Sequence, residues 1–317
     1  MTGTAFLFPG QGAQHVGMGL VLSQSYPEAQ ETFVQADAIL GFPLSTLCFE
    51  GPAEELTDTI NAQPAILTHS VAALRVLENH NGLRPDYVAG HSLGEFSALV
   101  AAGALTFEAA LRLVRERGRL MKLAGERSPG GMAAILGLPR EAVEAACESA
   151  RQETGGIVQI ANDNCPGQIV VSGEVPALEA AMAQAQAAGA RKVVRLAVSI
   201  AAHSPLMATV ADEFAAAVEA APIQKATIPI VGNVSARPLT HPDDLRAELT
   251  AQLTSPVRWT DSMRWLIEQG VKRVIELGPD KVLTGLMKRI DRRVTRINLE
   301  ESVEGLEVAE GRPTAGP

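Results

Sequence analysis

The chain has 317 residues, is 46% hydrophobic and carries a formal net charge of −9. This length allows one large domain or two, with a real core. The charge argues against nucleic acid and anionic membrane surfaces as partners, and no apolar run reaches the ~18 residues of a membrane span. The three cysteines (48, 147 and 165) show no metal-site spacing and predict a reducing compartment, so we expect a cytoplasmic protein.

The first predicted strand, residues 4–8, runs into a loop rich in glycine and glutamine (P-G-Q-G-A-Q, 9–14). In α/β sheets, ligands bind at the carboxyl ends of the strands, which is where this loop and Gln11 lie. A plain glycine-rich turn explains the loop equally well. Helices are predicted at 26–40 and 54–57, and a long helix introduced by residues 63–65 ends near 81–82.

Residues 86–102 form a strand-turn-helix signal around one serine. Positions 90–94 read G-H-S-L-G, the G-x-S-x-G pattern of a nucleophile elbow. The two glycines let strand and helix approach closely, and Ser92 occupies a strained turn with its hydroxyl exposed. The backbone N–H of Leu93 opens the helix and can hold a developing oxyanion. The bare pattern arises by chance in about one chain in ten of this length, so other stretches must support it.

A predicted helix at 106–121 carries four arginines. Helical geometry places Arg112, Arg115 and Arg119 on one face, whereas Arg117 lies nearer the apolar side. A buried arginine needs an anionic partner, because an unpaired buried charge is costly. An internal or snorkelling arginine and a ligand clamp are equally consistent with this position.

Residues 130–198 follow the order β-α-β-β-α-β, which is typical of a ferredoxin-like unit. Its predicted strands are 132–136, 157–161, 169–172 and 192–196, and its predicted helices are 140–151 and 176–188. The N-D-N-C-P-G cluster at 162–167 is expected to be the turn between the second and third strands. An inserted small domain creates a cleft beside the larger one, which is a preferred ligand site.

The chain returns to the larger domain at 198–205, and His203 lies there just before a predicted helix at 206–220. His203 and His91 are the candidates for a general base. Adjacent residues rarely present the accepting nitrogen to a serine, so we favour His203. Strands at 228–232, 273–277 and 294–297 alternate with helices at 245–253, 261–268 and 282–290. Glu, Gly and Pro dominate the end of the chain, which predicts a disordered tail at 301–317.

These pieces together resemble the malonyl-CoA:acyl-carrier-protein transacylases and the related acyltransferase domains of polyketide synthases. The resemblance covers residues 4–298, and its motifs are far more specific in combination than the elbow alone. They are F-P-G-Q-G-A-Q (8–14), Q-P-A (63–65), G-H-S-L-G-E (90–95), R-G (117–118) with Met121, N-D-N-C-P-G-Q (162–168), A-H-S (202–204) with Leu206 and Met207, Asn233, Q-L (252–253) before P-V (256–257), and E-L-G (276–278). The resemblance implies an α/β-hydrolase-like catalytic domain (1–129 and 199–300) with a ferredoxin-like insertion (130–198).

The resemblance also assigns roles to individual residues. Ser92 would be the nucleophile and His203 its base, which later protonates the leaving thiolate. A backbone carbonyl near Gln252 would orient the imidazole in place of a triad carboxylate. The amides of Gln11 and Leu93 would form the oxyanion hole.

Arg117 would hold the free carboxylate of malonate in a bidentate pair, a geometry that lysine cannot supply. The other substrate-binding candidates are Gln63, Gln252, Asn162, Ala202 and Ile200. No metal or redox cofactor is needed, and the coenzyme A thioester is a substrate.

Two positions depart from the family pattern. Asp280 stands where the family's E-x-G-P-G motif has its last glycine, which leaves the backbone of that turn in doubt. Ala202 precedes the histidine, where some malonyl-selective polyketide acyltransferases have phenylalanine. Because malonyl-specific members also have small residues there, Ala202 does not decide between malonyl and a branched unit; one methyl is worth only ~1–3 kcal/mol.

The predicted function is transfer of malonyl from malonyl-CoA to an acyl carrier protein, in fatty-acid or polyketide synthesis, by a monomer. Because carriers are acidic in most cases, we expect a basic patch formed by residues such as Arg191, Lys192 or Lys288. One alternative is a serine hydrolase or thioesterase on the same scaffold, which has no use for the buried cation Arg117. The other is a non-enzymatic docking subunit, which the intact site motifs argue against.

Overall fold

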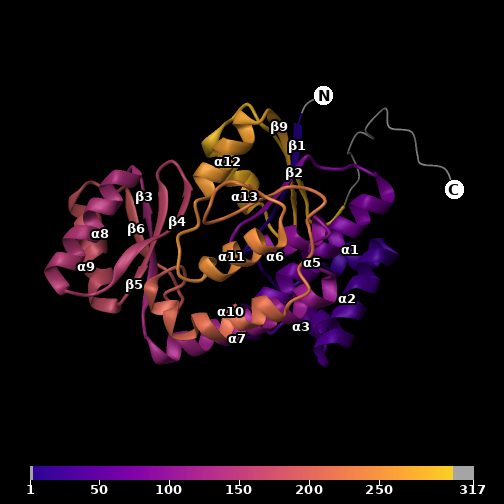
Figure 1. The fold of residues 1–317 in the computed structure, drawn as a ribbon, viewed down its shortest axis with the longest axis horizontal. Helices are drawn as coiled ribbons and strands as arrows, with labels where there is room; N and C mark the ends of the chain where they lie inside the picture. The colour runs from indigo at the N-terminus through magenta and orange to yellow at the C-terminus, as the bar shows by residue number, and fades with distance from the viewer. Residues whose placement is uncertain (1–2, 303–317) are drawn as a thin grey trace.

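The computed structural model describes residues 3–302 and contains two β-sheets with helices packed around them (Figure 1). The larger sheet has the strand order β10-β9-β1-β2-β7-β8 and is parallel except for β8. Its strands are β1 (Gly3–Phe8), β2 (Tyr87–Gly90), β7 (Ile230–Val231), β8 (Pro238–Leu239), β9 (Val271–Leu277) and β10 (Thr295–Leu299). The predicted mixed α/β fold with a parallel sheet is confirmed.

Alternation of side chains along β1 explains how helices cover both faces of this sheet. Phe6 and Phe8 pack into the cluster formed with α5, α6 and α7, whereas Ala5 and Leu7 pack on the opposite face against α12 and α13. The helices of this part are α1 (Leu20–Ser25), α2 (Pro27–Leu40), α3 (Leu44–Glu50), α4 (Ala53–Thr57), α5 (Thr59–His80), α6 (Gly94–Ala101), α7 (Phe107–Arg127), the 3-10 helix η1 (Pro205–Val210), α10 (Ala211–Ala220), α11 (Pro242–Gln252), α12 (Trp259–Glu268) and α13 (Val282–Ile290). The carboxyl ends of β1 and β2 therefore open onto α5–α7.

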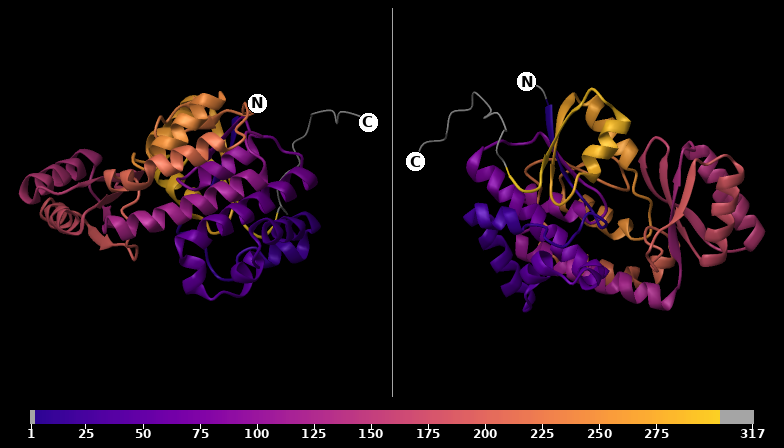
Figure 2. Two further views of the ribbon diagram at one scale, coloured as in Figure 1. Left: turned by 60° about the horizontal axis from the view of Figure 1, so that its bottom comes forward. Right: turned by 180° about the vertical axis from the view of Figure 1, so that it is seen from behind.

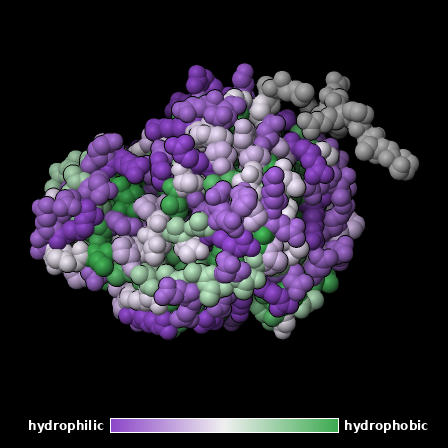
Figure 3. Space-filling model, viewed as in Figure 1, coloured by the Kyte–Doolittle hydropathy of each residue, from purple (hydrophilic) through white to green (hydrophobic). Residues whose placement is uncertain are grey.

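The smaller sheet is antiparallel and has the order β4-β5-β3-β6. Its elements are β3 (Gly131–Leu136), α8 (Arg140–Thr154), β4 (Val158–Cys165), β5 (Gln168–Gly173), α9 (Val175–Ala187) and β6 (Lys192–Arg195). Helices α8 and α9 cover its outer face, and this lobe projects from the rest of the molecule (Figure 2). In the space-filling view, apolar residues gather between this lobe and the main body, while the outer surfaces are mostly hydrophilic (Figure 3).

The structure corrects the predicted turn at 162–167. Strand β4 continues through Cys165, and only Pro166 and Gly167 form the turn. The polar residues stay in the strand because they bond to the main body: Asp163 N–H donates to the carbonyl of Val257 (2.9 Å) and Thr260 Oγ1 donates to Asp163 Oδ1 (2.6 Å). Tertiary bonds here override the turn preference of Asn and Asp.

Two helices also differ from expectation. Helix α5 begins at Thr59, so Pro64 lies inside it. The predicted helix at 206–220 is divided into η1 and α10 at Val210, whose φ and ψ are −129° and 4°. Apart from its first two residues, the tail predicted at 301–317 lies outside the described residues. Within residues 3–302, no helix combines the length and apolar character needed to cross a membrane.

Candidate active site

Ser92 occupies the tight turn between β2 and α6. Its φ of 50° is in the left-handed region, which is strained for a residue with a side chain. A Cβ at Gly90 would lie 1.9 Å from the carbonyl carbon of Gly94, and one at Gly94 would lie 2.0 Å from the carbonyl oxygen of Phe8. Only glycine fits at both positions, so these two residues allow the close backbone contacts that the sharp turn at Ser92 requires.

The side chain of Asn233, from the loop after β7, stabilises this turn with two hydrogen bonds. Its Oδ1 accepts the backbone N–H of Ser92 (2.7 Å) and its Nδ2 donates to the carbonyl of Gly90 (2.7 Å). Asn233 is fully buried. Both ends of one amide therefore hold the backbone on either side of His91. The sequence motifs include Asn233 but assign it no role.

His203 lies against the hydroxyl of Ser92, with 2.8 Å between its Nε2 and Ser92 Oγ. On the other side of the ring, Nδ1 is 2.8 Å from the carbonyl oxygen of Gln252. Since a carbonyl only accepts, Nδ1 carries the proton and Nε2 is the acceptor for the serine proton. Burial, and then the charge of Arg117, lowers the pKa of His203 to about 3, so the ring is neutral and able to act as a base.

His91 faces a different way. Its Nε2 is 2.8 Å from Oδ1 of Asn164, and its ring packs edge-on against Trp259. Asn164 belongs to β4, so this bond ties the elbow to the smaller sheet. The Nε2 atom of His91 is therefore engaged by Asn164 and is not available to take the proton of Ser92.

Arg117 projects from α7 into the same site and is 1% exposed. Its Nη2 donates to Gln252 Oε1 (2.8 Å) and to Ser92 Oγ (3.2 Å), and its Nη1 donates to Gln63 Oε1 (2.9 Å). Its Nε has no hydrogen-bond partner within residues 3–302. Burial lowers the pKa of Arg117 to about 10, partly opposed by the charge of Glu95, so the guanidinium stays charged at neutral pH.

The nearest compensating charge, Glu95, reaches Arg117 only through Gln252. Gln252 Nε2 donates to Glu95 Oε2 and to the carbonyl of Ser92 (3.1 Å). Burial, and then the charge of Glu248, raises the pKa of Glu95 well above its usual value. The amide of Gln252 therefore separates the cation from the carboxyl, which leaves the cation available to an anionic group beside Ser92.

The loop after β1 packs directly on the elbow. A Cβ at Gly10 would lie 2.4 Å from the carbonyl oxygen of His91, and His91 N–H donates to the carbonyl of Phe8 (3.0 Å). Gln11 follows Gly10, and its Oε1 accepts from Thr59 Oγ1 (2.9 Å). The candidate oxyanion donors, the amides of Gln11 and Leu93, thus belong to two segments in mutual contact.

The remaining predicted residues are less tightly connected. Asn162, in β4, forms an isolated β-bridge with Val257 in the segment between α11 and α12, and no hydrogen bond within the described chain joins Asn162 to Ser92 or His203. Ala202 is 8% exposed and precedes His203 directly. Ile200 lies against Gly125 of α7. Sequence reasoning did not single out Thr59, whose only signal is a polar side chain at a helix start, and it included Glu95 in the G-H-S-L-G-E motif without a role.

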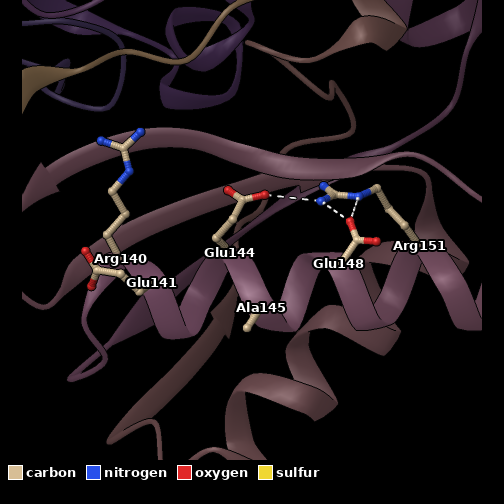
Figure 4. A pocket seen from close by; sticks show the side chains of 6 residues that line it. All are labelled: Arg140, Glu141, Glu144, Ala145, Glu148 and Arg151. Carbon is tan, nitrogen blue, oxygen red and sulfur yellow. Dashed lines mark hydrogen bonds and ion pairs between the residues drawn. The ribbon is translucent and has the colours of Figure 1, made fainter.

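A separate surface hollow of about 430 Å³ lies along α8 (Figure 4). Its lining residues are Arg140, Glu141, Glu144, Ala145, Glu148 and Arg151. Arg151 forms ion pairs with Glu144 (3.1 Å) and Glu148 (2.7 Å) in this hollow. Within residues 3–302, no group of three His, Cys, Asp or Glu side chains is arranged to hold a metal ion.

Residues 5–307 match the acyl transferase domain family. The malonyl CoA-acyl carrier protein transacylase of Bacillus subtilis is 47% identical over 98% of this chain and 96% of its own, and that of Escherichia coli K12 is 46% identical over 95% and 97%.

Solved structures agree with these matches. The transacylase of the same name from Coxiella burnetii has a TM-score of 0.92 and 41% identity, covering 94% of each chain. A malonyl-transacylase in complex with a type II PKS acyl-carrier protein also has a TM-score of 0.92 and 41% identity, covering 95% of this chain and 97% of its own.

Proposed function

The chain belongs to the acyl transferase family, and we propose that it moves malonyl from malonyl-CoA to the phosphopantetheine thiol of an acyl carrier protein through an acyl-enzyme on Ser92. The observation that carries the proposal is the 3.2 Å contact between Arg117 Nη2 and Ser92 Oγ. It puts a buried cation one hydrogen bond from the nucleophile, where an acyl group that ends in a carboxylate can span the two.

In the first half-reaction, Ser92 Oγ attacks the thioester carbonyl while His203 Nε2 takes the hydroxyl proton. The amides of Gln11 and Leu93 hold the resulting oxyanion. The C–S bond then breaks, and the proton on His203 passes to the coenzyme A thiolate. Malonyl is left as an ester on Ser92.

The second half-reaction reverses these steps with a different thiol. His203 Nε2 takes the proton of the carrier thiol, whose sulfur attacks the ester carbonyl. The C–O bond breaks and the proton returns to Ser92 Oγ. The reaction is therefore ping-pong, and the Ser92–His203 dyad needs no third carboxylate because the carbonyl of Gln252 orients the ring.

Arg117 selects the acyl group by holding its carboxylate. The five N–H donors of a guanidinium match a carboxylate, and the dry surroundings strengthen the pair. Gln63 and Gln252 hold the guanidinium, and we assign Ala202, Ile200 and Asn162 to the surrounding acyl and pantetheine path. No bound metal or redox cofactor takes part in these steps.

We further propose that the two sheets belong to an α/β-hydrolase-like catalytic domain (1–129 and 199–300) and a ferredoxin-like insertion (130–198). The sheet orders support this division. The enzyme is expected to work as a cytoplasmic monomer in fatty-acid or polyketide synthesis. Its cysteines are free and buried, which suits a reducing compartment.

An intact-mass measurement tests the proposed function. Brief exposure of the native chain to malonyl-CoA should give a malonyl adduct on Ser92 that transfers to a carrier protein, whereas acetyl-CoA should give little. The adduct should be lost in Ser92→Ala and should fall sharply in Arg117→Ala. Rapid release of free acid without a transferable adduct would instead make the chain a hydrolase.

The carrier is proposed to dock on the exposed basic residues near the turn between β4 and β5. Arg191 packs on Gly137, whose N–H donates to the carbonyl of Gly167 (2.9 Å), and Arg289 Nη2 donates to the same carbonyl (3.4 Å). Lys192 and Lys288 are the exposed neighbours of these two arginines. The turn follows Asn164, which holds His91, so this surface lies close to the nucleophile.

Charge reversal tests the docking surface. Lys192→Glu and Lys288→Glu should raise the KM for an acidic carrier several-fold, more at low salt than at high salt. Lys225→Glu, an exposed lysine elsewhere on the chain, is the matched control. A carrier KM that is the same in all three variants and the native chain would exclude this surface.

A further inference from the structure

We propose that Thr59 is a positioning residue that carries the orientation of Arg117 to Gln11 through a directed chain of hydrogen bonds. The inference rests on the proposed function, in which Arg117 binds the acyl carboxylate and the Gln11 amide stabilises the oxyanion. Among the described residues, no hydrogen bond joins the Thr59 hydroxyl to Ser92 or His203. Its side chain lies between the two parts of the site.

Thr59 is the first residue of α5 and is 5% exposed. Its Oγ1 accepts from Gln63 Nε2 (3.0 Å) and donates to Gln11 Oε1 (2.9 Å). Gln63 lies one helical turn later, and its Oε1 accepts from Arg117 Nη1 (2.9 Å). Four side chains from three segments of the chain are thus joined end to end.

The direction of every bond in this chain is determined by chemistry. A guanidinium only donates, so the oxygen of the Gln63 amide must face Arg117. The nitrogen of that amide then faces Thr59, whose hydroxyl has to accept there. The single hydroxyl proton of Thr59 is left to donate, and it goes to Gln11 Oε1. A hydroxyl is suited to this place because it accepts and donates at once.

The backbone of Thr59 is held in place by α7. A Cβ at Gly118 would lie 2.7 Å from the carbonyl oxygen of Thr59, so the two helices touch beside Arg117. Asp58 caps α5 by accepting the N–H of Ile60 (3.2 Å), and Lys122 of α7 pairs with Asp58 (2.5 Å). These contacts fix the backbone of Thr59, so the direction of its hydroxyl proton depends on the bond from Gln63 and not on a shift of the helix.

The consequence is that recognition of the carboxylate and stabilisation of the oxyanion are coupled. Gln11 is exposed and follows a glycine, and its side-chain bond to Thr59 helps to orient the loop, together with the bond from Gly12 N–H to Gln14 Oε1 (2.7 Å). When Arg117 is ordered by a bound carboxylate, Gln63 and Thr59 are ordered with it. The Gln11 amide is then set for the tetrahedral intermediate.

The test uses Thr59→Val, which keeps the side-chain shape and removes the hydroxyl. Rapid-quench acylation of Ser92 by malonyl-CoA should slow by roughly 10- to 100-fold, with little change in KM. Thr59→Ser, which keeps the hydroxyl, should restore most of the rate. Thr68→Val is the matched control, because Thr68 is a buried threonine of the same helix whose hydroxyl donates to the carbonyl of Pro64 and, among residues 3–302, has no bond to the site.

A double-mutant cycle with Arg117→Ala separates the relay from a local role of Thr59. Thr59→Val should slow acylation much less in the Arg117→Ala background than in the native one, because the chain is already broken there. An equal effect in both backgrounds, or a native acylation rate in Thr59→Val, would overturn the proposal. If Thr59→Val does not fold, Thr59→Ala removes the same hydroxyl and is interpreted in the same way. A native chain that forms no adduct at all would refute the proposed function instead.

Discussion

Arg117 is held by oxygen atoms that carry no full charge. Two glutamine amides and one serine hydroxyl accept its bonds, and Glu95 stands behind Gln252. A guanidinium paired directly with a carboxylate would be neutralised and of little use to a ligand. Amide oxygens hold the cation in place and leave most of its charge uncompensated, which suits recognition of an anionic substrate.

Helical periodicity was sufficient to predict that Arg117 lies toward the apolar side of its helix, because this position follows from residues three and four places away. Asn233 and Thr59 could not be found in this way. Asn233 contacts Ser92 across 141 positions, and Thr59 contacts Gln11 across 48. Roles that depend on such distant partners become visible only once the fold brings the segments together.

Asn233 provides the first prediction. Asn233→Ala should lower the free energy of unfolding by about 2 kcal/mol, because it leaves the buried N–H of Ser92 and carbonyl of Gly90 without partners. Acylation of Ser92 should also slow by about tenfold, since the left-handed turn loses its support. Urea unfolding and rapid-quench acylation measure the two effects.

The control for Asn233 is Ser262→Ala, which removes a buried hydroxyl that bonds to the carbonyl of Gly232 (3.2 Å), just before Asn233. That variant should lose some stability and keep the native acylation rate. Acylation by Asn233→Ala at the native rate would show that the turn holds its shape without the amide.

At the level of elements, helix α5 contains a proline and compensates for it. Pro64 has no N–H to give to the carbonyl of Ile60, four residues earlier. Arg115 of α7 takes this carbonyl instead, with Nη1 donating at 2.7 Å. The carbonyl that Pro64 leaves free in α5 is therefore hydrogen-bonded to α7, the helix that carries Arg117.

This exchange predicts non-additive stabilities. Arg115→Met keeps an apolar side chain but removes the guanidinium from the Phe42 ring and leaves the carbonyl of Ile60 unpaired, and should cost about 1–2 kcal/mol in urea unfolding. Pro64→Ala restores an N–H within the helix, so Arg115→Met should cost clearly less in that background. Equal costs in both backgrounds would mean that the carbonyl has no part in the effect.

Most elements could be predicted because each is a local pattern. The strand ending at Gly90, the helix after Gly94 and the helix at 282–290 lie where periodicity and glycine positions put them. The exceptions are segments whose polar groups find distant partners. In β4, Asp163 looks like a turn residue by composition, and bonds to Val257 and Thr260 keep it in a strand.

At the level of the whole molecule, the site lies where the larger sheet meets the smaller one. β2 supplies the elbow, α7 supplies Arg117, and β4 reaches back to His91 through Asn164. The sequence predicted both groups of strands, but no local pattern specifies how the two sheets are placed against each other. That placement depends on contacts such as the bridge between Asn162 and Val257.

The last prediction concerns acid stability and His69 in α5. Its ring is fully buried, and no hydrogen bond of normal geometry from the described residues reaches either nitrogen. Burial, and then the nearby His15, lowers the pKa of His69 to about 3, while the backbone of Glu300 opposes the shift. In the unfolded chain, His69 binds a proton below its ordinary pKa of about 6.5. In the folded chain, it binds a proton only near pH 3, so the free energy of unfolding falls as the pH falls from about 6.5 to about 3.

His69→Leu removes this proton linkage. Between pH 7 and pH 5, the native free energy of unfolding should fall by about 2 kcal/mol more than that of His69→Leu. Two other buried groups also change the stability with pH. The pKa of His203 is lowered to about 3, whereas burial raises the pKa of Glu276 to about 7, so these groups change the free energy of unfolding in opposite directions. Both are present in the native chain and in His69→Leu, so their contributions cancel in the comparison. Parallel curves for the native chain and His69→Leu would show that the buried ring takes up its proton without unfolding, by opening the contact between the loop after β1 and the end of β10.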